Sequence, residues 1–243
     1  MMKDSFVIGV STEMRMEIAK AYAPWIYFDE REPFFPALVG ISHYAPGEAS
    51  ASFRRTFEWD GAPLKTIIEY AIYWDYDIQH LYELEHVWIY VGESGEVLDC
   101  EASFHGKFFK GLLKDRSNLE GTRVKLYSQP GKHAFMPHPD YFQLLPDLVT
   151  CTSRDAGTHG LIITDVLKGR METTPSINRR VEQYLRTKAF IPSMKFNKYE
   201  LEDRLYVDWQ ELWHSIPIRI RDCLRELGSE DEIIGGETAA ISK

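Results

Sequence analysis

Short runs of apolar residues, each interrupted by a few polar ones, recur along the first 130 residues of the chain. Six segments of this kind are rich in β-branched and aromatic residues, which are typical of β-strands. These segments are 38–44, 51–57, 65–77, 85–93, 96–103 and 123–129. The sequence GESGE, at 92–96, has the composition of a tight turn and predicts a hairpin. The first half of the chain is therefore expected to form a β-sheet core.

Helical spacing, with apolar residues three and four positions apart, marks three other segments. The first begins after Ser11 or Thr12, either of which can cap a helix, and it ends at a proline. The other two span 176–190 and 201–228. Pro217 lies inside the last segment and is expected to kink or split that helix.

Together these elements predict an α+β protein that is mainly β, with helices chiefly in its C-terminal part. Neither an internal repeat nor a low-complexity linker divides the sequence. A single domain over residues 1–243 is therefore the simplest arrangement.

The charge balance limits the classes of partner. The 37 acidic residues outnumber the 28 basic ones, which gives a net charge of -9. A nucleic-acid partner is disfavoured, because binding to phosphates depends on clustered Lys and Arg side chains. No transmembrane segment is expected, since no 18 apolar residues are consecutive. The apolar run at 6–10 is too short for a signal peptide, which favours a cytoplasmic protein.

Carboxylate and histidine side chains are concentrated in the sequence DYDIQHLYELEHVW. In the strand that ends here, alternation places Asp75 and Asp77 on one face. In the strand that follows, Glu83 and Glu85 share a face. His80 lies in the short connection between the two acidic pairs, so it is expected to join Asp77 and the glutamates in one cluster.

Carboxylates that approach a dry interior must be paired, protonated or bound to a cation. Oxygen ligands of this kind suit Mg²⁺, Ca²⁺ or Mn²⁺, and an added imidazole shifts the preference toward a transition metal. A divalent-cation site is therefore predicted at Asp77, His80, Glu83 and Glu85. An ordinary solvent-exposed acidic face explains the same alternation, because antiparallel sheets commonly leave one face in water.

Several short sequences resemble the necrosis-inducing (NPP1-like) proteins and the related Vps62-like family. They are the run AIYWDYD…H..E.E…V..YV, the later SFHG, the GKHAFMP beyond it, and YAPWIYFDEREPFFP near the N-terminus. The resemblance covers roughly residues 20–140. It implies a β-sandwich core over about 20–150 that holds a divalent cation at one end. Residues 155–230 are then expected to form a helical C-terminal extension packed on this core.

The resemblance also implies roles for individual residues. The ligand positions of the family, which are an aspartate, a histidine and two further acids, correspond to Asp77, His80, Glu83 and Glu85. Glu83 replaces an aspartate, which keeps an oxygen ligand and changes only its reach. Tyr82 stands where the family has a second histidine. Two later histidines of the family correspond to His105 and His133.

Three functions are compatible with such a protein. In the first, the bound cation receives a small polar ligand, such as a sugar or a lipid head group, at the end of the sheet. In the second, the chain is a metal-dependent hydrolase in which His105 or His133 acts as general acid or base. In the third, it is a non-catalytic interaction protein whose last helix docks on a partner through Trp209 and Trp213.

Overall fold

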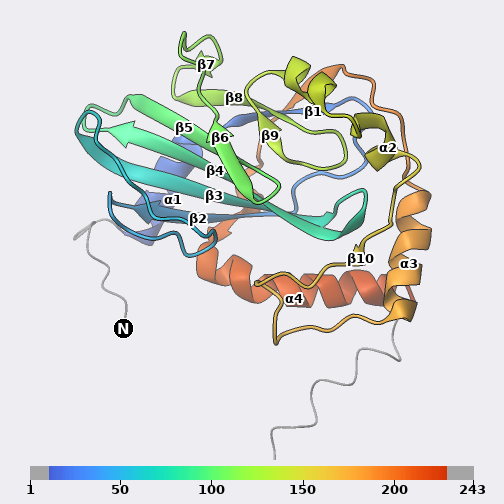
Figure 1. Cartoon of the computed structure of the whole chain (residues 1–243). Helices are drawn as coiled ribbons and strands as arrows, with labels where there is room; N and C mark the ends of the chain where they lie inside the picture. The colour runs from blue at the N-terminus through green and yellow to red at the C-terminus, as the bar shows by residue number, and fades with distance from the viewer. Residues whose placement is uncertain (1–10, 229–243) are drawn as a thin grey trace, which may run out of the picture.

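The computed structural model describes residues 11–228, so the apolar run at 6–10 lies outside it. The protein is mainly β, with two stacked β-sheets and helices chiefly in the C-terminal part, as predicted. Helix α4 (Trp209–Glu226) runs along the outer face of the larger sheet, and α3 (Pro175–Arg186) stands at one end (Figure 1). Within 11–228, no helix combines the length and the apolar character needed to cross a membrane.

The larger sheet has seven strands. They are β2 (Leu38–Tyr44), β3 (Leu64–Tyr76), β4 (His80–Gly92), β5 (Val97–Phe104), β6 (Lys107–Lys110), β10 (Gly160–Leu161) and β12 (Tyr206–Asp208). Their order is β12-β2-β3-β4-β5-β6, and β10 pairs with β4 at one end of that strand. The predicted hairpin between β4 and β5 is confirmed.

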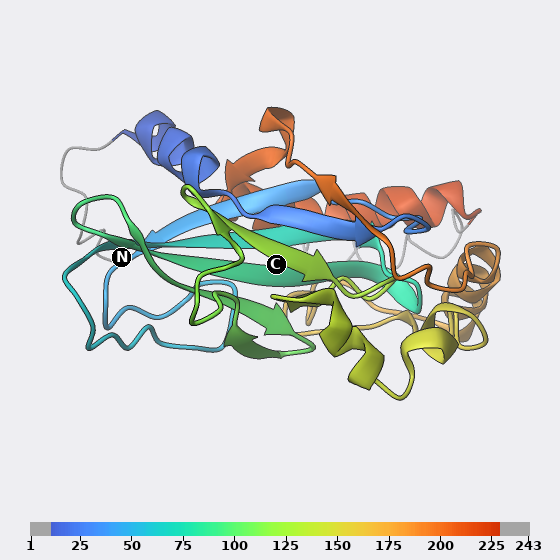
Figure 2. The same cartoon turned by 90° about the horizontal axis from the view of Figure 1, so that it is seen from above.

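The smaller sheet has five strands and lies over the larger one. They are β1 (Trp25–Asp29), β7 (Leu119–Glu120), β8 (Arg123–Ser128), β9 (Phe135–Met136) and β11 (Phe196–Tyr199). Their order is β11-β1-β8-β7, with β9 beside β8. Seen from above, β1 and β8 cross in front of the strands of the larger sheet (Figure 2). The remaining helices are α1 (Thr12–Tyr22), α2 (Leu148–Thr152) and two 3₁₀ helices, η1 (Pro139–Leu144) and η2 (Asp203–Leu205).

The long hairpin of β3 and β4 is the centre of the core, and both of its faces are covered. On one face Trp74 packs edge-on against Phe28 of the smaller sheet, with the ring centroids 6.5 Å apart. On the other face the larger sheet packs against α4. A Cβ atom at Gly40 would lie 2.7 Å from the side chain of Leu212, so glycine lets the helix approach the sheet closely.

Pro217 does not split α4, which continues as one helix from Trp209 to Glu226. A proline cannot donate the N–H that normally bonds the carbonyl four residues earlier. Here the carbonyl of Trp213 accepts a hydrogen bond from the guanidinium of Arg170 instead, at 2.8 Å. The same guanidinium lies over the Trp213 ring, 4.2 Å from its centroid. Trp209 is buried against the sheet, whereas Trp213 is half-buried.

Segment 51–57 is not a strand, so that prediction is wrong. The hydroxyl oxygen of Ser50 accepts hydrogen bonds from the N–H groups of Ser52 and Phe53, at 3.2 and 3.0 Å. Such local bonds offer the backbone an alternative to a β ladder, and here they turn the chain. The segment takes part in a single β-bridge, at Thr56.

Residues 196–208 supply strands to both sheets, so the predicted extension at 155–230 is not helical throughout. β11 pairs with β1 in antiparallel fashion, and β12 pairs with β2 in parallel fashion. The helix predicted over 201–228 begins only at Trp209. Asp208 caps it, because its carboxylate accepts the N–H of Gln210 at 2.8 Å.

Two isoleucines of α4 allow a matched test of this packing. Ile216 is 0% exposed against the sheet, whereas Ile218 is 55% exposed. We expect Ile216→Ala to lower the free energy of unfolding by about 2–5 kcal/mol, because it leaves a cavity in the core. Ile218→Ala removes the same atoms from the surface and should change stability by about 0.5 kcal/mol or less. Urea denaturation of both variants measures the difference, and equal losses would contradict the packing of α4.

Candidate metal centre

The turn between β3 and β4 contains only residues 77–79, and it holds Asp77 inside the protein. The N–H of Asp77 donates to the carbonyl of His80 at 2.9 Å, and its Oδ1 accepts the N–H of Gln79 at 2.7 Å. Ile78 is bonded on both sides, since its N–H donates to Gly131 and its carbonyl accepts from Gly157. Two loops from other parts of the chain therefore clamp the turn, and the Asp77 side chain is 0% exposed.

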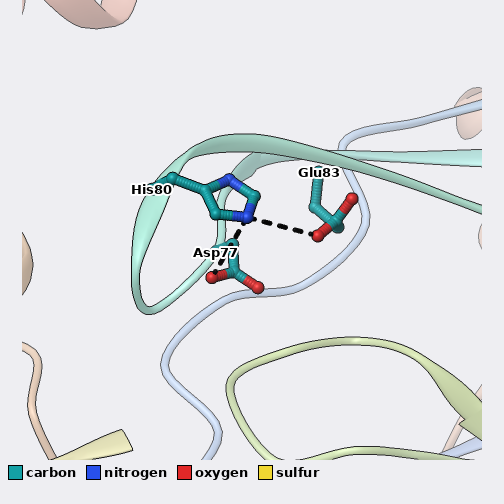
Figure 3. Close-up of side chains that lie close together, drawn as sticks. All are labelled: Asp77, His80 and Glu83. Atoms are coloured by element: carbon teal, nitrogen blue, oxygen red, sulfur yellow. Dashed lines mark ion pairs between the residues drawn. The ribbon is translucent and has the colours of Figure 1, made fainter. Parts of the chain in front are cut away.

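Asp77, His80 and Glu83 come together at this turn (Figure 3). The Nε2 atom of His80 is 3.6 Å from Asp77 Oδ1 and 3.6 Å from Glu83 Oε2. One ligand atom from each residue lies within 4.8 Å of the others. The structure thus brings three of the four predicted ligands into one group.

The histidine is held in the form that a cation requires. His80 Nδ1 is 2.8 Å from the carbonyl oxygen of Tyr82. A carbonyl only accepts, so Nδ1 carries the proton, and the lone pair of Nε2 faces the two carboxylates. Burial lowers the pKa of His80 to about 4, which keeps the imidazole neutral at physiological pH.

Backbone strain explains how residues three positions apart meet on one side of a strand. Tyr82 has a φ of 57°, in the left-handed region that bulky residues rarely occupy. This residue interrupts the strict alternation of β4, so that His80 and Glu83 face the same side. Of the five non-glycine residues in 11–228 with positive φ, three lie around this site: Tyr82, His105 and His133. Strain of this kind often accumulates at functional sites.

His105 has a simpler reason for its conformation. It forms, with Gly106, the two-residue turn between β5 and β6, and both residues have positive φ, at 50° and 76°. Positive φ at both central residues is the requirement of a type I′ hairpin turn. The sequence SFHG is therefore explained in part by the geometry of this hairpin.

Glu85 is buried one step farther along β4, and its oxygens are outside the group of three. Its carboxylate accepts hydrogen bonds from the hydroxyl of Ser103 and from the N–H of His105. Its strand neighbour across the sheet is Ile72, just as Trp74 is the neighbour of Glu83. Both glutamates therefore face the smaller sheet.

Asp75 does not share a face with Asp77, contrary to expectation. Its carboxylate binds the guanidinium of Arg219 on α4, with N–O distances of 2.9 and 2.5 Å. The reason is that Asp77 leaves the strand at the turn, whereas Asp75 keeps the alternation of β3 and points to the helix side of the sheet.

Lys132 is a member of the site that sequence reasoning missed. Its ammonium is nearly buried and lies 2.6 Å from Asp77 Oδ1. It comes from the loop between β8 and β9, which reaches the turn through Gly131. The signal in the sequence was the Pro-Gly turn that precedes it, which returns the chain to the sheet end together with His133.

The carboxylates are more numerous than the cations that neutralise them. Burial alone would raise the pKa of Asp77, but Lys132 and His80 together lower it to about 2. Burial raises the pKa of Glu83 well above its usual range, and the charges of Glu85 and Asp77 add to the effect. Burial also raises the pKa of Glu85 to about 7. Glu83 and Glu85 therefore keep protons near neutral pH. A bound cation would supply the positive charge that these protons otherwise supply.

A cavity of about 460 Å³ opens beside this group. Its lining includes His80, Glu83, Glu85 and His105, together with Arg54 and Asp165 from two other segments. The Nε2 atom of His105 is 2.9 Å from Gln129 Oε1. A small molecule in this cavity would therefore contact His80 and Glu83 directly.

His133 lies apart from the cavity. Its ring is 0% exposed and stacks on Trp74, with centroids 4.6 Å apart and the planes 7° from parallel. Its Nε2 is 3.3 Å from Glu32 Oε1. Of the two histidines that sequence reasoning singled out for catalysis, only His105 lines the cavity.

No protein-family model matches the chain, and no curated protein matches it. Among solved structures, NLPPya in complex with glucosamine is similar at 17% sequence identity and a TM-score of 0.34, over 49% of this chain and 64% of that one. NLPPya in complex with mannosamine is similar at 19% sequence identity and a TM-score of 0.35, over 56% of this chain and 76% of that one. Necrosis and Ethylene inducing Protein 2, from the causal agent of cocoa's Witches Broom disease, is similar at 18% sequence identity and a TM-score of 0.33, over 56% of this chain and 73% of that one.

The pKa of Glu85 leads to a test of the site without added metal. In the unfolded chain this carboxyl should titrate near its usual pKa of about 4.3, whereas in the folded protein it titrates at about 7. The folded protein therefore loses stability as the pH rises between these values, by an amount on the order of 3 kcal/mol. Glu85→Gln cannot ionise and should not show this loss.

The measurement is the free energy of unfolding of both proteins in urea, with a chelator present, from pH 4 to pH 8. We expect the free energy of unfolding of Glu85→Gln to increase relative to that of the wild-type protein as the pH rises. A difference between the two that stays constant over this range would contradict the raised pKa.

Proposed function

We propose that this protein binds a divalent cation between Asp77, His80 and Glu83, and that the cation receives a small polar ligand from the adjoining cavity. The observation that carries the proposal is the meeting of these three ligand atoms within 4.8 Å. Surface carboxylates gather without a cation in many proteins, but here Asp77 is fully buried. Lys132 supplies one positive charge at its Oδ1, and a cation would supply a second beside the buried Oδ2 and the carboxylate of Glu83.

Each proposed ligand has one polar atom held by the protein and another left for a cation. Asp77 Oδ1 is held by Gln79 and Lys132, whereas its Oδ2 is buried and has no hydrogen-bond partner within residues 11–228. His80 is held through Nδ1, and Glu83 is held through Oε1, which accepts the N–H of Leu84 at 2.8 Å. Partners behind the ligands orient them in this way in known metal sites. The residues present therefore fit a cation.

Two carboxylates and one imidazole suit Mg²⁺, Ca²⁺ or Mn²⁺, and the nitrogen ligand favours Mn²⁺ among these. The ammonium of Lys132 already offsets the charge of Asp77. We therefore infer that the affinity for a divalent cation is moderate, because the site presents less net negative charge than its carboxylates suggest.

The ligand is proposed to be a sugar or a polar lipid head group. The cavity of about 460 Å³ is within the range of small-molecule sites, which is roughly 300–1,000 Å³. Beside the candidate ligands its lining includes Ser52 and the ion pair of Arg54 with Asp165. A hydroxyl group of a ligand both donates and accepts hydrogen bonds, so it can pair with a donor or with an acceptor of the cavity.

A metal-dependent hydrolase is the second candidate, and the position of His105 favours it. The chemistry that a divalent cation supplies in hydrolases is the activation of water. The contribution of this chain would be the imidazole of His105, which lines the same cavity as Glu83 and is oriented by Gln129. From this position it could exchange a proton with a bound substrate.

Thermal melting tests cation binding. With Mg²⁺, Ca²⁺ or Mn²⁺ at about 100 times its dissociation constant, the folded state gains about 2.7 kcal/mol. For a chain of this size we expect the melting temperature to rise by roughly 5–10 °C relative to a chelator. His80→Ala and Glu83→Gln should remove this rise.

Matched controls come from exposed positions on α4. His214→Ala and Glu211→Gln make the same chemical changes at a distance from the turn and should keep the full response. A rise that persists in both His80→Ala and Glu83→Gln would overturn the cation site.

A substitution at His105 tests the hydrolase. Asparagine tolerates positive φ, so His105→Asn keeps the hairpin turn and removes the imidazole. If the protein hydrolyses any member of a panel of phosphate and carboxylate esters with Mn²⁺ present, this variant should lose at least about 100-fold of the rate. Its thermal response to Mn²⁺ should remain. The absence of turnover across the panel would contradict the hydrolase and leave ligand binding.

A further inference from the structure

A second cavity, of about 830 Å³, lies between the β5–β6 hairpin, the loop that follows it, and η1. It shares no lining residue with the cavity beside the candidate metal centre. Leu98, Leu112 and Met136 are among the apolar residues that line it. This cavity is therefore a separate feature that neither the cation nor its ligand explains.

Large apolar side chains at the rim of this cavity remain exposed. Phe109 is 47% exposed, Tyr141 is 42% exposed and Leu144 is 79% exposed. Single exposed apolar residues are ordinary, but several around one concave surface are typical of a binding site. The cavity thus offers a surface for an apolar ligand body.

The charges at the rim have the opposite sign to the charge of the whole chain. Lys110, Lys114 and Arg116 line the cavity with a single acid, Asp99. The chain as a whole carries a net charge of -9. Lys110 neutralises Asp99, since its ammonium lies 2.5 Å from that carboxylate.

Two positive charges remain. Arg116 donates to the carbonyl of Val97 at 2.6 Å and forms no ion pair with a carboxylate in the part of the chain that the structure describes. Lys114 is exposed and pairs with no carboxylate within residues 11–228. An anionic group at the rim would meet both side chains, and a guanidinium is well suited to a carboxylate.

Hydrogen bonds within the protein fix the loop that carries these two charges. Asn118 is buried and fixes the loop with three hydrogen bonds. Its Oδ1 accepts the N–H of Leu113 at 2.9 Å, and its Nδ2 donates to the carbonyls of Gly111 and Lys125 at 2.8 and 3.1 Å. A preformed wall reduces the loss of conformational freedom on binding.

We infer that this cavity binds a free amphipathic carboxylate, such as a medium-chain fatty acid. The apolar chain lies along Leu98, Leu112 and Phe109, and the carboxylate lies at Lys114 and Arg116. The inference does not depend on the cation site, because the two cavities have no residue in common.

Isothermal titration calorimetry with octanoate, decanoate and decyltrimethylammonium tests the inference on the full chain. We expect both carboxylates to bind, and decanoate to bind roughly tenfold more tightly than octanoate because it buries two more methylene groups. Decyltrimethylammonium has the same apolar chain and the opposite charge, so it should bind at least fivefold more weakly than decanoate.

Lys114→Glu should weaken decanoate binding at least fivefold, and the exposed position of Lys114 makes a loss of folding from this change unexpected. Lys107→Glu makes the same change on β6, outside the cavity, and should leave the affinity unchanged.

Four results would overturn the inference. The first is no binding of either carboxylate, and the second is equal binding of decanoate and decyltrimethylammonium. The third is equal weakening in the two lysine variants. The fourth is binding to vesicles of phosphatidylserine and phosphatidylcholine without binding of free decanoate, which would assign the surface to a membrane.

Discussion

The burial of Asp77 at the turn between β3 and β4 is the constraint on which both the fold and the site depend. A carboxylate without water must receive hydrogen bonds and positive charge from the protein. Gln79 provides the first and Lys132 the second. The loop that carries Lys132 is bonded to the same turn through Ile78, and a loop near Gly157 is bonded to it from the other side. The turn thus joins three distant parts of the chain, and the clamped geometry fixes where His80 and Glu83 can point.

The central strands were predictable because their apolar and aromatic residues are nearly continuous, as expected where both faces of a sheet are covered. The prediction failed where tertiary pairing decides. β1 lies in a stretch with three prolines and becomes a strand by pairing with β8 and β11. β12 has only three residues and depends on its neighbour β2. In contrast, 51–57 has strand-like residues, but the hydroxyl of Ser50 gives its backbone a local alternative.

The candidate site was predictable to the extent that it is local in sequence. Asp77, His80 and Glu83 lie within seven positions, so a turn between two strands was sufficient to bring them together. Lys132 was not predictable, because it arrives from a loop more than fifty residues away, and the Pro-Gly turn before it indicates a change of direction but not where the loop packs. The left-handed conformation of Tyr82 was also hidden, since tyrosine has no preference for it. The shared face predicted for Asp75 and Asp77 was wrong because alternation does not continue through a turn: Asp75 lies within β3, whereas Asp77 lies beyond its end.

The pairing of the outer strands has a consequence for the folding of the chain during its synthesis on the ribosome. β1 and β2 leave the exit tunnel early, but their partners β11 and β12 are made last. At a synthesis rate of about 5–20 residues per second, the two nascent edges wait roughly ten to thirty seconds for those partners. During that interval each edge presents unpaired backbone groups that can associate with other chains. The order of synthesis thus leaves these two sheet edges unpaired until residues 196–208 have been made.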